Sequence, residues 1–208
     1  MSNINIIEEY LDTLIPDPKC ELQYKKDYEL LIATVLSAQS TDKRVNSVTP
    51  VLFDKYDSLE KLENASLKDI EFIIKPVGTY KKKAVFIKSI AYNINHNNNG
   101  FFPKKRKILL TYPGVGRKTT NVVLNELYDI PAIAVDTHVE RVSKRLGLAK
   151  NKDNVLEVEE KLKRKIKRVN WGRRHKQLVL FGRYYCKAVK PNCSDCNLKN
   201  ICKFYKSL

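Results

Sequence analysis

The stretch ILLTYPGVGRKTTNVVLN, residues 108–125, decides how this chain folds. It begins as the end of an apolar helix, breaks at PGVG, and continues as a second apolar segment with helical spacing. Gly114 and Gly116 permit a positive φ angle and let another molecule approach the backbone closely. The first N–H groups of the following helix have no partner inside that helix, so they can hold a phosphate together with the helix dipole. The stretch therefore predicts two helices joined by a phosphate-binding hairpin, with an ordinary helix–helix turn as the alternative.

Helical spacing also dominates on both sides of the hairpin. The segment Tyr28–Ala38 is almost wholly apolar and predicts a buried helix, although a strand has the same pattern there. Two further sets of apolar residues recur at helical intervals: Ile87, Ile90, Ala91 and Ile94, and then Val155, Val158, Leu162, Ile166 and Val169. No strand–helix–strand alternation is visible, so we predict an all-α protein.

Capping residues mark the starts of several predicted helices. Ser66 with Asp69, and Thr137 with Glu140, have the spacing of an N-cap and its reciprocal acid. The asparagine-rich run 95–99 is typical of a polar loop.

The charge of the chain indicates its partner. Its 208 residues include 39 Lys and Arg against 23 Asp and Glu, a formal net charge of +16. Residues 1–80 hold 9 basic and 14 acidic side chains, whereas residues 81–208 hold 30 and 9. A balance so basic is unusual for an enzyme of small neutral metabolites and favours nucleic acid as partner. The runs Lys81–Lys83 and Lys104–Lys107 are expected on the solvated surface, with phosphate contacts as the alternative.

The start and the hydropathy of the chain bear on its location. No stretch approaches the roughly 18 apolar residues of a membrane span. The segment MSNINIIEEYLDTLIP also lacks the basic region and long apolar run of a secretory signal. We therefore expect an intracellular protein, cytoplasmic or associated with the nucleoid, that is not secreted and has no membrane partner.

Two charged residues near helix starts are candidates for catalysis. Lys118 follows Arg117 at the start of the second hairpin helix, and both the arginine and the helix dipole favour the neutral amine that a nucleophile requires. Asp136, in AIAVDTHVERV, stands at another helix start. It can be a simple N-cap, or a carboxylate that stabilises positive charge on a sugar, as carboxylates do in glycosidases.

Four cysteines near the end of the chain predict a metal centre. Cys186, Cys193, Cys196 and Cys202 follow the spacing C-x6-C-x2-C-x5-C. Both tetrahedral zinc and a [4Fe–4S] cluster accept four cysteines, and the wide gaps around a single C-x2-C favour the bulkier iron–sulfur cluster over zinc or unliganded thiols. The loop between the first two cysteines carries Lys187 and Lys190, which a metal-stapled loop would present to phosphates.

Four blocks of sequence together resemble one known family. LLIATVLSAQSTD (30–42), YPGVGRKTTNVVLN (112–125), AVDTHVERV (134–142) and the four-cysteine tail are similar to endonuclease III. That family comprises DNA glycosylase/AP lyases of the helix-hairpin-helix superfamily with a [4Fe–4S] cluster. The blocks occur in the family's order and span roughly residues 22–203.

The resemblance implies a two-domain architecture around a DNA-binding cleft. Residues 21–130 would form a six-helix domain that contains the hairpin. Residues 1–20 and 131–208 would form a helical domain that carries the cluster loop at 186–202. The two domains would flank the cleft.

The resemblance also implies the roles of individual residues. Lys118 matches the family's catalytic lysine, Asp136 its catalytic aspartate, and Gln39 the glutamine that helps to fill the gap left by a flipped nucleotide. His138 matches a histidine for which we expect a structural or phosphate-contact role. The other expected DNA contacts belong to the hairpin and to a wedge loop: Gly114, Val115, Gly116, Arg117 and Thr119, and Gly78, Thr79 and Tyr80.

Three positions depart from the family's pattern, one of which is Phe181, before Gly182 and Arg183, where a histidine is common. The wedge loop usually offers an apolar residue after its glycine, whereas Gly78 is followed by Thr79 and Tyr80. Either of these residues could then be the wedge. The family's leucine before the hairpin proline is Tyr112 in this chain.

The expected function is that of a monomeric, bifunctional base-excision-repair enzyme. It would remove oxidised pyrimidines from double-stranded DNA through a lysine Schiff base, and cleave the strand 3′ to the abasic site by β-elimination. Its substrates would be DNA containing damaged pyrimidines or abasic sites. The alternatives are a non-catalytic iron–sulfur DNA-binding or sensor module, which needs neither Lys118 nor Asp136, and a zinc-stapled RNA-binding protein.

Overall fold

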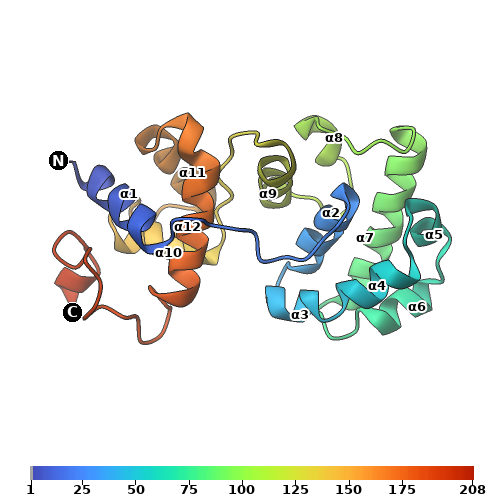
Figure 1. The fold of residues 1–208 in the computed structure, drawn as a ribbon, viewed down its shortest axis with the longest axis horizontal. Coiled ribbons are helices and arrows are strands. Elements are labelled where there is room, and N and C mark those ends of the chain that lie inside the picture. The colour runs from blue at the N-terminus through green and yellow to red at the C-terminus, as the bar shows by residue number, and fades with distance from the viewer. Residues whose placement is uncertain (1) are drawn as a thin grey trace. The chain divides into compact units, whose positions relative to one another are not determined.

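The structure, a computed structural model, describes residues 2–208, and every regular element in that range is helical (Figure 1). The α-helices are α1 (Asn3–Leu14), α2 (Asp27–Leu36), α3 (Asp42–Asn46), α4 (Thr49–Lys55), α5 (Leu59–Asn64), α6 (Leu67–Ile73), α7 (Tyr80–Tyr92), α8 (Arg106–Leu109), α9 (Arg117–Tyr128), α10 (Thr137–Arg145), α11 (Val155–Lys165) and α12 (Trp171–Tyr184). Shorter helical turns are η1 (Asn93–Asn97), η2 (Arg168–Asn170) and η3 (Tyr205–Ser207). None of the helices in the described range is long and apolar enough to cross a membrane.

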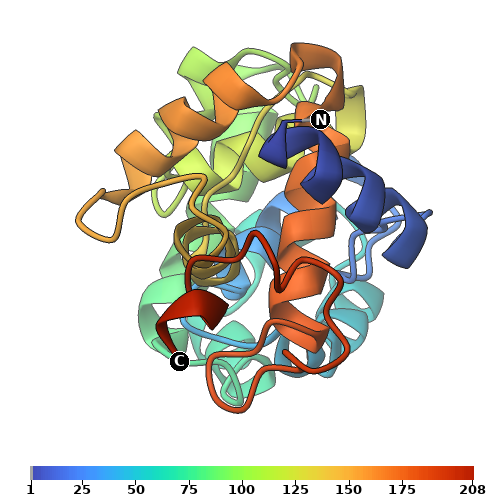
Figure 2. The ribbon, with the colours of Figure 1, turned by 90° about the vertical axis from the view of Figure 1, so that its left-hand side faces the viewer.

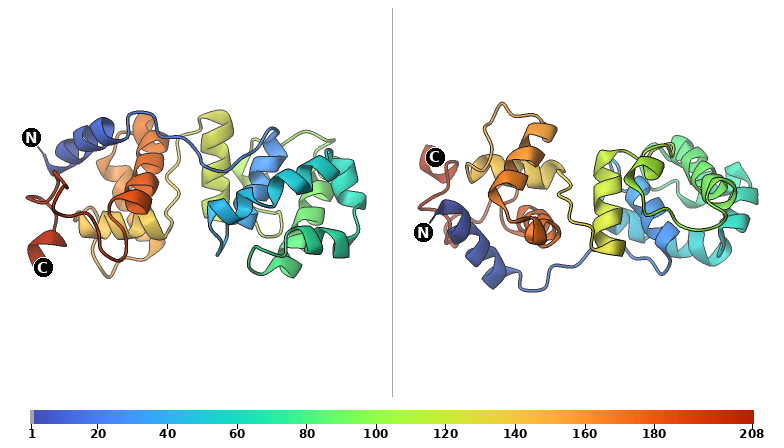
Figure 3. Two further views of the ribbon diagram at one scale, coloured as in Figure 1. Left: turned by 60° about the horizontal axis from the view of Figure 1, so that its bottom comes forward. Right: turned by 90° about the horizontal axis from the view of Figure 1, so that it is seen from above.

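The chain forms two compact units, each with its own hydrophobic core. Unit 1 comprises Met1–Lys19 and Asp129–Leu208, and unit 2 comprises Cys20–Tyr128. The chain therefore passes between the units twice (Figure 3). Unit 2 contains the α-helices α2 to α9 and the π-helical turn η1, and several of these helices, such as α3 and α8, are short.

Helix α2 lies at the centre of unit 2. Nine of its ten residues are buried, so the prediction of a buried helix within Tyr28–Ala38 is confirmed. Helices α7 and α9 both pack against it. At its first turn the buried Glu29 carboxylate accepts the backbone N–H groups of Lys25 at 2.7 Å and Lys26 at 3.2 Å, which satisfies donors that a helix start leaves without partners.

Helix α7 supplies a second side of the same core. Ile87, Ile90, Ala91 and Ile94 are all buried, as their spacing predicted. The loop expected at 95–99 begins instead as the π-helical turn η1, which continues α7. Side-chain amides stabilise this turn, because Asn95 donates to Glu63 at 2.8 Å and Asn97 donates to Asn93 at 2.7 Å.

Unit 1 is built from α1, α10, α11 and α12 and ends in a largely irregular tail. Helix α1 packs beside α12, and α10 packs on α12 (Figure 2). The buried Arg174 guanidinium of α12 donates to Glu8 at 2.9 Å and to Asp12 at 2.6 and 2.7 Å, both on α1. Its hydrogen bond holds the pKa of Asp12 well below the usual range of a carboxyl.

Three details of the sequence-based reading of these helices are wrong. Val155 and Val169 are exposed, because Val155 is the first residue of α11 and Val169 lies in η2, beyond the end of that helix at Lys165. The N-cap of α10 is Asp136 rather than Thr137. Ser66 is the N-cap of α6, but its side chain makes no capping hydrogen bond.

Candidate nucleic-acid-binding and catalytic site

The hairpin of unit 2 is a tight turn that packs directly on the core. Val115 N–H donates to the Tyr112 carbonyl at 3.0 Å, and both side chains are buried. Gly114 has φ of +80°, and a β-carbon there would lie 2.3 Å from the Phe86 ring. The turn therefore requires glycine at this position for two separate reasons, backbone angle and space.

Gly116 serves the hairpin differently from Gly114. It does not appear among the residues with positive φ, and a β-carbon there would meet no atom within 4 Å. The freedom of Gly116 to adopt a positive φ is therefore not used in this turn. Its backbone is open to another molecule, and its carbonyl accepts the N–H of Thr120 at 3.0 Å as α9 begins.

The first turn of α9 carries the candidate nucleophile. Arg117 and Lys118 are exposed, and Thr119 is half-buried. A helix start leaves its first N–H groups without partners inside the helix and carries a partial positive charge. The exposed residues Gly116, Arg117 and Lys118 at such a helix start suit a DNA phosphate and its neighbouring sugar.

Two loops of unit 2 hold the other residues expected to enter DNA. Gln39, between α2 and α3, is exposed, with φ of 55°. Gly78 and Thr79, before α7, are exposed, whereas Tyr80 is half-buried and packs against the core. A β-carbon on Gly78 would lie 3.5 Å from the Gln39 carbonyl oxygen, so the two loops are neighbours.

Unit 1 positions Asp136 at the start of α10. One carboxylate oxygen, Oδ1, accepts the backbone N–H groups of His138 at 2.9 Å and Val139 at 2.8 Å. The N-cap interpretation of Asp136 is therefore confirmed, and it is compatible with catalysis because the cap uses only Oδ1. His138 Nδ1 lies 3.2 Å from Arg141 Nη2. A β-carbon on Gly182 of α12 would lie 2.9 Å from the Cβ of His138, so glycine lets α12 approach α10 here.

The four cysteines of unit 1 line one cavity of about 310 Å³. Cys202 is buried, and the other three thiols are half-buried. Burial, and then the charge of Cys186 and Cys202, raises the pKa of the Cys193 thiol. Four thiols that surround one space disfavour each other's ionisation, which a cationic iron centre would reverse. The residues therefore fit a four-thiolate cluster.

No group of three or more His, Cys, Asp and Glu within residues 2–208 is gathered closely enough to hold a single metal ion. The preference for iron–sulfur over zinc therefore rests on the spacing of the four cysteines in the sequence.

Arg145, which the sequence reasoning missed, ties the start of the cysteine segment to α10. It donates to the carbonyls of Lys187 at 2.6 Å and Ala188 at 3.1 Å, and lies 3.4 Å from the Cys186 sulfur. Its own carbonyl accepts the N–H of Phe204 at 3.1 Å. The only available signal was a basic residue in the last turn of the helix that begins at Asp136.

The expected phosphate contacts of this segment lie on its outer side. Lys187 and Lys190 are both exposed, and Lys190 has φ of 48°. The structure thus divides the predicted groups: Lys118, Gln39, the hairpin and the wedge loop belong to unit 2, while Asp136, His138, these lysines and the cysteines belong to unit 1.

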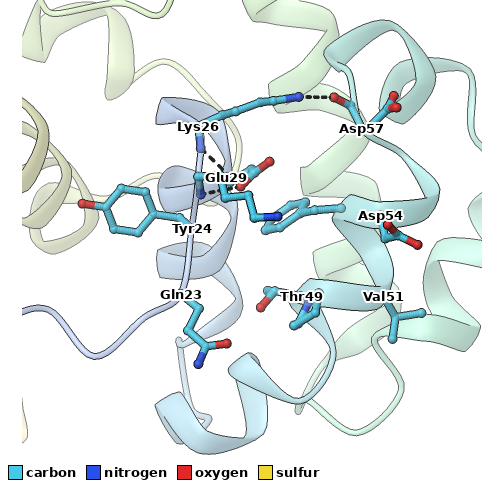
Figure 4. A pocket seen from close by; sticks show the side chains of 11 residues that line it. Gln23, Tyr24, Lys26, Glu29, Thr49, Val51, Asp54 and Asp57 are labelled. Atoms are coloured by element: carbon cyan, nitrogen blue, oxygen red, sulfur yellow. Dashed lines mark hydrogen bonds between the residues drawn. The ribbon is translucent and has the colours of Figure 1, made fainter.

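The hollow shown in Figure 4 is separate from these groups. It has a volume of about 820 Å³ and lies beside the start of α2 and helix α4, with Tyr24, Glu29 and Asp54 among its lining residues. Glu29 already caps α2, and Lys26 Nζ donates to the Asp57 carbonyl. None of the residues predicted to act on DNA lines it.

The all-α fold, the glycine hairpin with its exposed lysine and the four-cysteine tail define a helix-hairpin-helix repair protein. Residues 32–168 match the model of the HhH-GPD superfamily base excision DNA repair protein. Endonuclease III of Bacillus subtilis (strain 168) is 45% identical over 206 residues, which cover 98% of this chain and 94% of that relative. The chain belongs to the endonuclease III family, as its sequence motifs predicted.

Two solved structures are similar along the whole chain. One is a trapped endonuclease III–DNA covalent intermediate, and the other a non-covalent endonuclease III–DNA complex. Each has a TM-score of 0.94 and 42% sequence identity, and each match covers 100% of this chain and 98% of the other. The predicted all-α fold is therefore confirmed.

Proposed function

We propose that this chain is a bifunctional DNA glycosylase and DNA-(apurinic or apyrimidinic site) lyase that removes oxidised pyrimidines from double-stranded DNA. The observation that carries the proposal is Lys118, an exposed amine in the first turn of α9, directly after the open backbone of Gly116. A protein that only binds DNA needs a basic surface but no nucleophile at the hairpin. Its relatives named endonuclease III support the same reaction.

Lys118 acts as the nucleophile. Its neutral amine attacks C1′ of the damaged nucleotide, the glycosidic bond breaks, and the base leaves with the bonding electron pair and takes up a proton. The attacking nitrogen then loses a proton, the C1′–O4′ bond breaks and O4′ takes up that proton, which opens the sugar ring and leaves a protonated Schiff base between lysine and C1′. Removal of a C2′ proton breaks the C3′–O bond and cleaves the strand 3′ to the site. Water then hydrolyses the Schiff base and frees the enzyme.

Asp136 stabilises the positive charge that develops on the sugar as the base departs. Its carboxylate is held by the N–H groups of His138 and Val139, which fixes its position without using Oδ2.

DNA binding comes from backbone and basic groups. The hairpin residues Gly114 to Thr119 hold phosphates of one strand through N–H groups and the dipole of α9. Gln39 fills the gap left by the extruded nucleotide, and Thr79 or Tyr80 separates the neighbouring bases. Damaged bases that pair and stack poorly cost less to extrude, which contributes to selectivity. His138, Lys187 and Lys190 add phosphate contacts.

Cys186, Cys193, Cys196 and Cys202 would hold the [4Fe–4S] cluster that the family resemblance implies. When bound, the cluster supplies four fixed attachment points for the tail. The protein residues around it then keep Lys187 and Lys190 in place for phosphates.

The protein works as a monomer, inside the cell where duplex DNA is found.

Borohydride trapping tests the proposal. Wild-type protein mixed with duplex DNA bearing one oxidised pyrimidine should form a covalent crosslink when the Schiff base is reduced. Lys118→Gln should form none, while its affinity for the same DNA changes little. Lys68→Gln is a matched control, because Lys68 is also an exposed lysine at the second position of a helix, α6. A wild-type protein that binds the duplex but never crosslinks would instead favour a non-catalytic DNA-binding module.

A further inference from the structure

Two neighbouring loops of unit 2 share an unusual backbone feature. Gln39 and Thr79 both have φ of 55°, in the left-handed region that residues other than glycine rarely adopt. Such conformations persist only where the surroundings hold them. The loops also touch, since a β-carbon on Gly78 would lie 3.5 Å from the Gln39 carbonyl oxygen. Some group must hold both loops in place.

Lys83 of α7 is that group. The expectation that it lies on the surface is wrong, because only 3% of it is exposed. Its Nζ atom donates to the Leu36 carbonyl at 2.8 Å and to the Ala38 carbonyl at 2.6 Å. Burial lowers the pKa of this lysine, while the two carbonyls and the C-terminal end of α2 favour its positive charge.

The hydrogen bonds at the end of α2 explain why a lysine is needed there. The last carbonyl groups of a helix have no partners within it. Backbone N–H groups of the turn serve the carbonyls of Val35 and Ser37. The carbonyls of Leu36 and Ala38, which alternate with these, accept from the buried ammonium of Lys83. Removing the ammonium would therefore release the segment that leads directly into Gln39.

The same residue also holds the second loop. The backbone N–H of Lys83 donates to the Thr79 carbonyl at 3.1 Å, in the first turn of α7. Its side chain reaches Ala38, the residue before Gln39, while its backbone holds Thr79 itself. One residue thus connects the two strained positions.

We propose that Lys83 is a positioning residue that fixes the Gln39 loop against the Gly78–Thr79 loop in the conformation in which both enter duplex DNA. The inference rests on the proposed function, in which Gln39 fills the gap and Thr79 or Tyr80 acts as wedge. Lys83 touches neither DNA nor the reacting sugar. It keeps both loops ordered before DNA arrives, so that binding does not have to order them.

The test compares borohydride trapping on two abasic DNAs, one duplex and one single-stranded. Only the duplex has a gap to fill and neighbouring base pairs to separate. Lys83→Met should lower the trapping rate on the duplex by about tenfold or more, as misplacement of positioning groups does, and leave the single-stranded rate within about twofold. A merely structural role would lower both rates equally. Lys83→Arg keeps a charged donor and should restore most of the duplex rate.

Two further variants sharpen the comparison. Lys88→Met is the matched control, because Lys88 lies on the same helix and its Nζ also donates to a carbonyl at a helix end, that of Ala65. It should leave the ratio of the two rates unchanged. The double variant Lys83→Met/Gln39→Ala should be no slower on duplex DNA than Gln39→Ala alone, because Lys83 acts through that loop.

The results separate this inference from the proposed function. Absence of any wild-type crosslink would overturn the proposed function. A wild type that crosslinks, together with an unchanged rate ratio in Lys83→Met or losses that multiply in the double variant, would overturn the inference alone. If Lys83→Met also loses single-stranded trapping, the double-variant comparison is made with the milder Lys83→Gln, which keeps a neutral donor. Coupling to Gln39→Ala then supports the inference, and independent losses overturn it.

Discussion

The hairpin of unit 2 and the cysteine tail of unit 1 are both expected to touch phosphates, yet they are built in opposite ways. The hairpin is a glycine turn whose Tyr112 and Val115 side chains are buried in the core. Beyond Tyr184, the described part of the tail has η3 as its only regular element. Its contacts are the hydrogen bonds to Arg145, the space that the four thiols line, and a small apolar contact in which Leu198, Ile201 and Phe204 pack on the core of unit 1. The hairpin is therefore held by its glycine turn and by core packing, whereas the tail has little regular structure and we expect the proposed cluster to complete it.

Loss of the proposed cluster should have the largest effect, because it should destabilise the tail and leave the hairpin unchanged. Cys193→Ser removes one of the four proposed ligands, and ligation is coupled to folding in segments with little regular structure of their own. We expect loss of the iron chromophore, and faster hydrogen exchange in residues 186–208 by about 100-fold or more. Exchange in the hairpin should stay at wild-type rates. A colourless wild-type protein with a protected tail would contradict the assignment of iron–sulfur ligands.

The two hairpin glycines should differ in a way that tests packing directly. Gly114→Ala combines an unfavourable φ with a clash against Phe86, so we expect a loss of about 3 kcal/mol in the free energy of unfolding. Gly116→Ala is the matched control and should cost less than about 1 kcal/mol, because its β-carbon meets no neighbour. It should nevertheless weaken DNA binding, because a methyl group would stand where a phosphate approaches. Urea unfolding and binding titrations measure both effects, and equal losses of stability would refute this account of the turn.

The smallest expected effect concerns the α1–α12 contact of unit 1, which does not depend on the cysteines. Asp12 accepts from Arg174, and its side chain is 41% exposed, so Asp12→Asn should cost only about 1 kcal/mol at neutral pH. The pKa of Asp12 is lower in the folded chain than its value of about 3.9 when unfolded. Its contribution is therefore present above about pH 4 and is lost as the pH falls below that value. Unfolding curves of the two proteins should converge in acid; a constant difference would contradict this role.

Sequence patterns predicted the parts of the fold that depend on local periodicity. The spacing of Ile87, Ile90 and Ile94 is a property of one helix face, and their burial followed from it. The glycine turn could also be predicted, because glycine is the residue type that adopts the backbone angles of a tight turn most easily. Membership of the endonuclease III family followed from motifs that carry chemistry.

Contacts between segments far apart in the sequence could not be predicted from residue spacing. Lys83 looks like part of a surface run, and only its reach to the end of α2, 45 residues earlier at Ala38, explains its burial. Arg145 holds carbonyls more than 40 residues away. Asn95 lies in a run of residues typical of a loop, and its hydrogen bond to Glu63 could not be predicted from that run. Each of these depends on tertiary packing that residue spacing does not encode.

The most direct test of the central claim is to identify the residue that becomes attached to DNA. The wild-type protein is reduced with borohydride on duplex DNA containing one oxidised pyrimidine, the crosslinked product is digested with protease and nuclease, and the modified peptide is sequenced by mass spectrometry. We expect a single adduct, on the side-chain nitrogen of Lys118. An adduct on any other amine would contradict it.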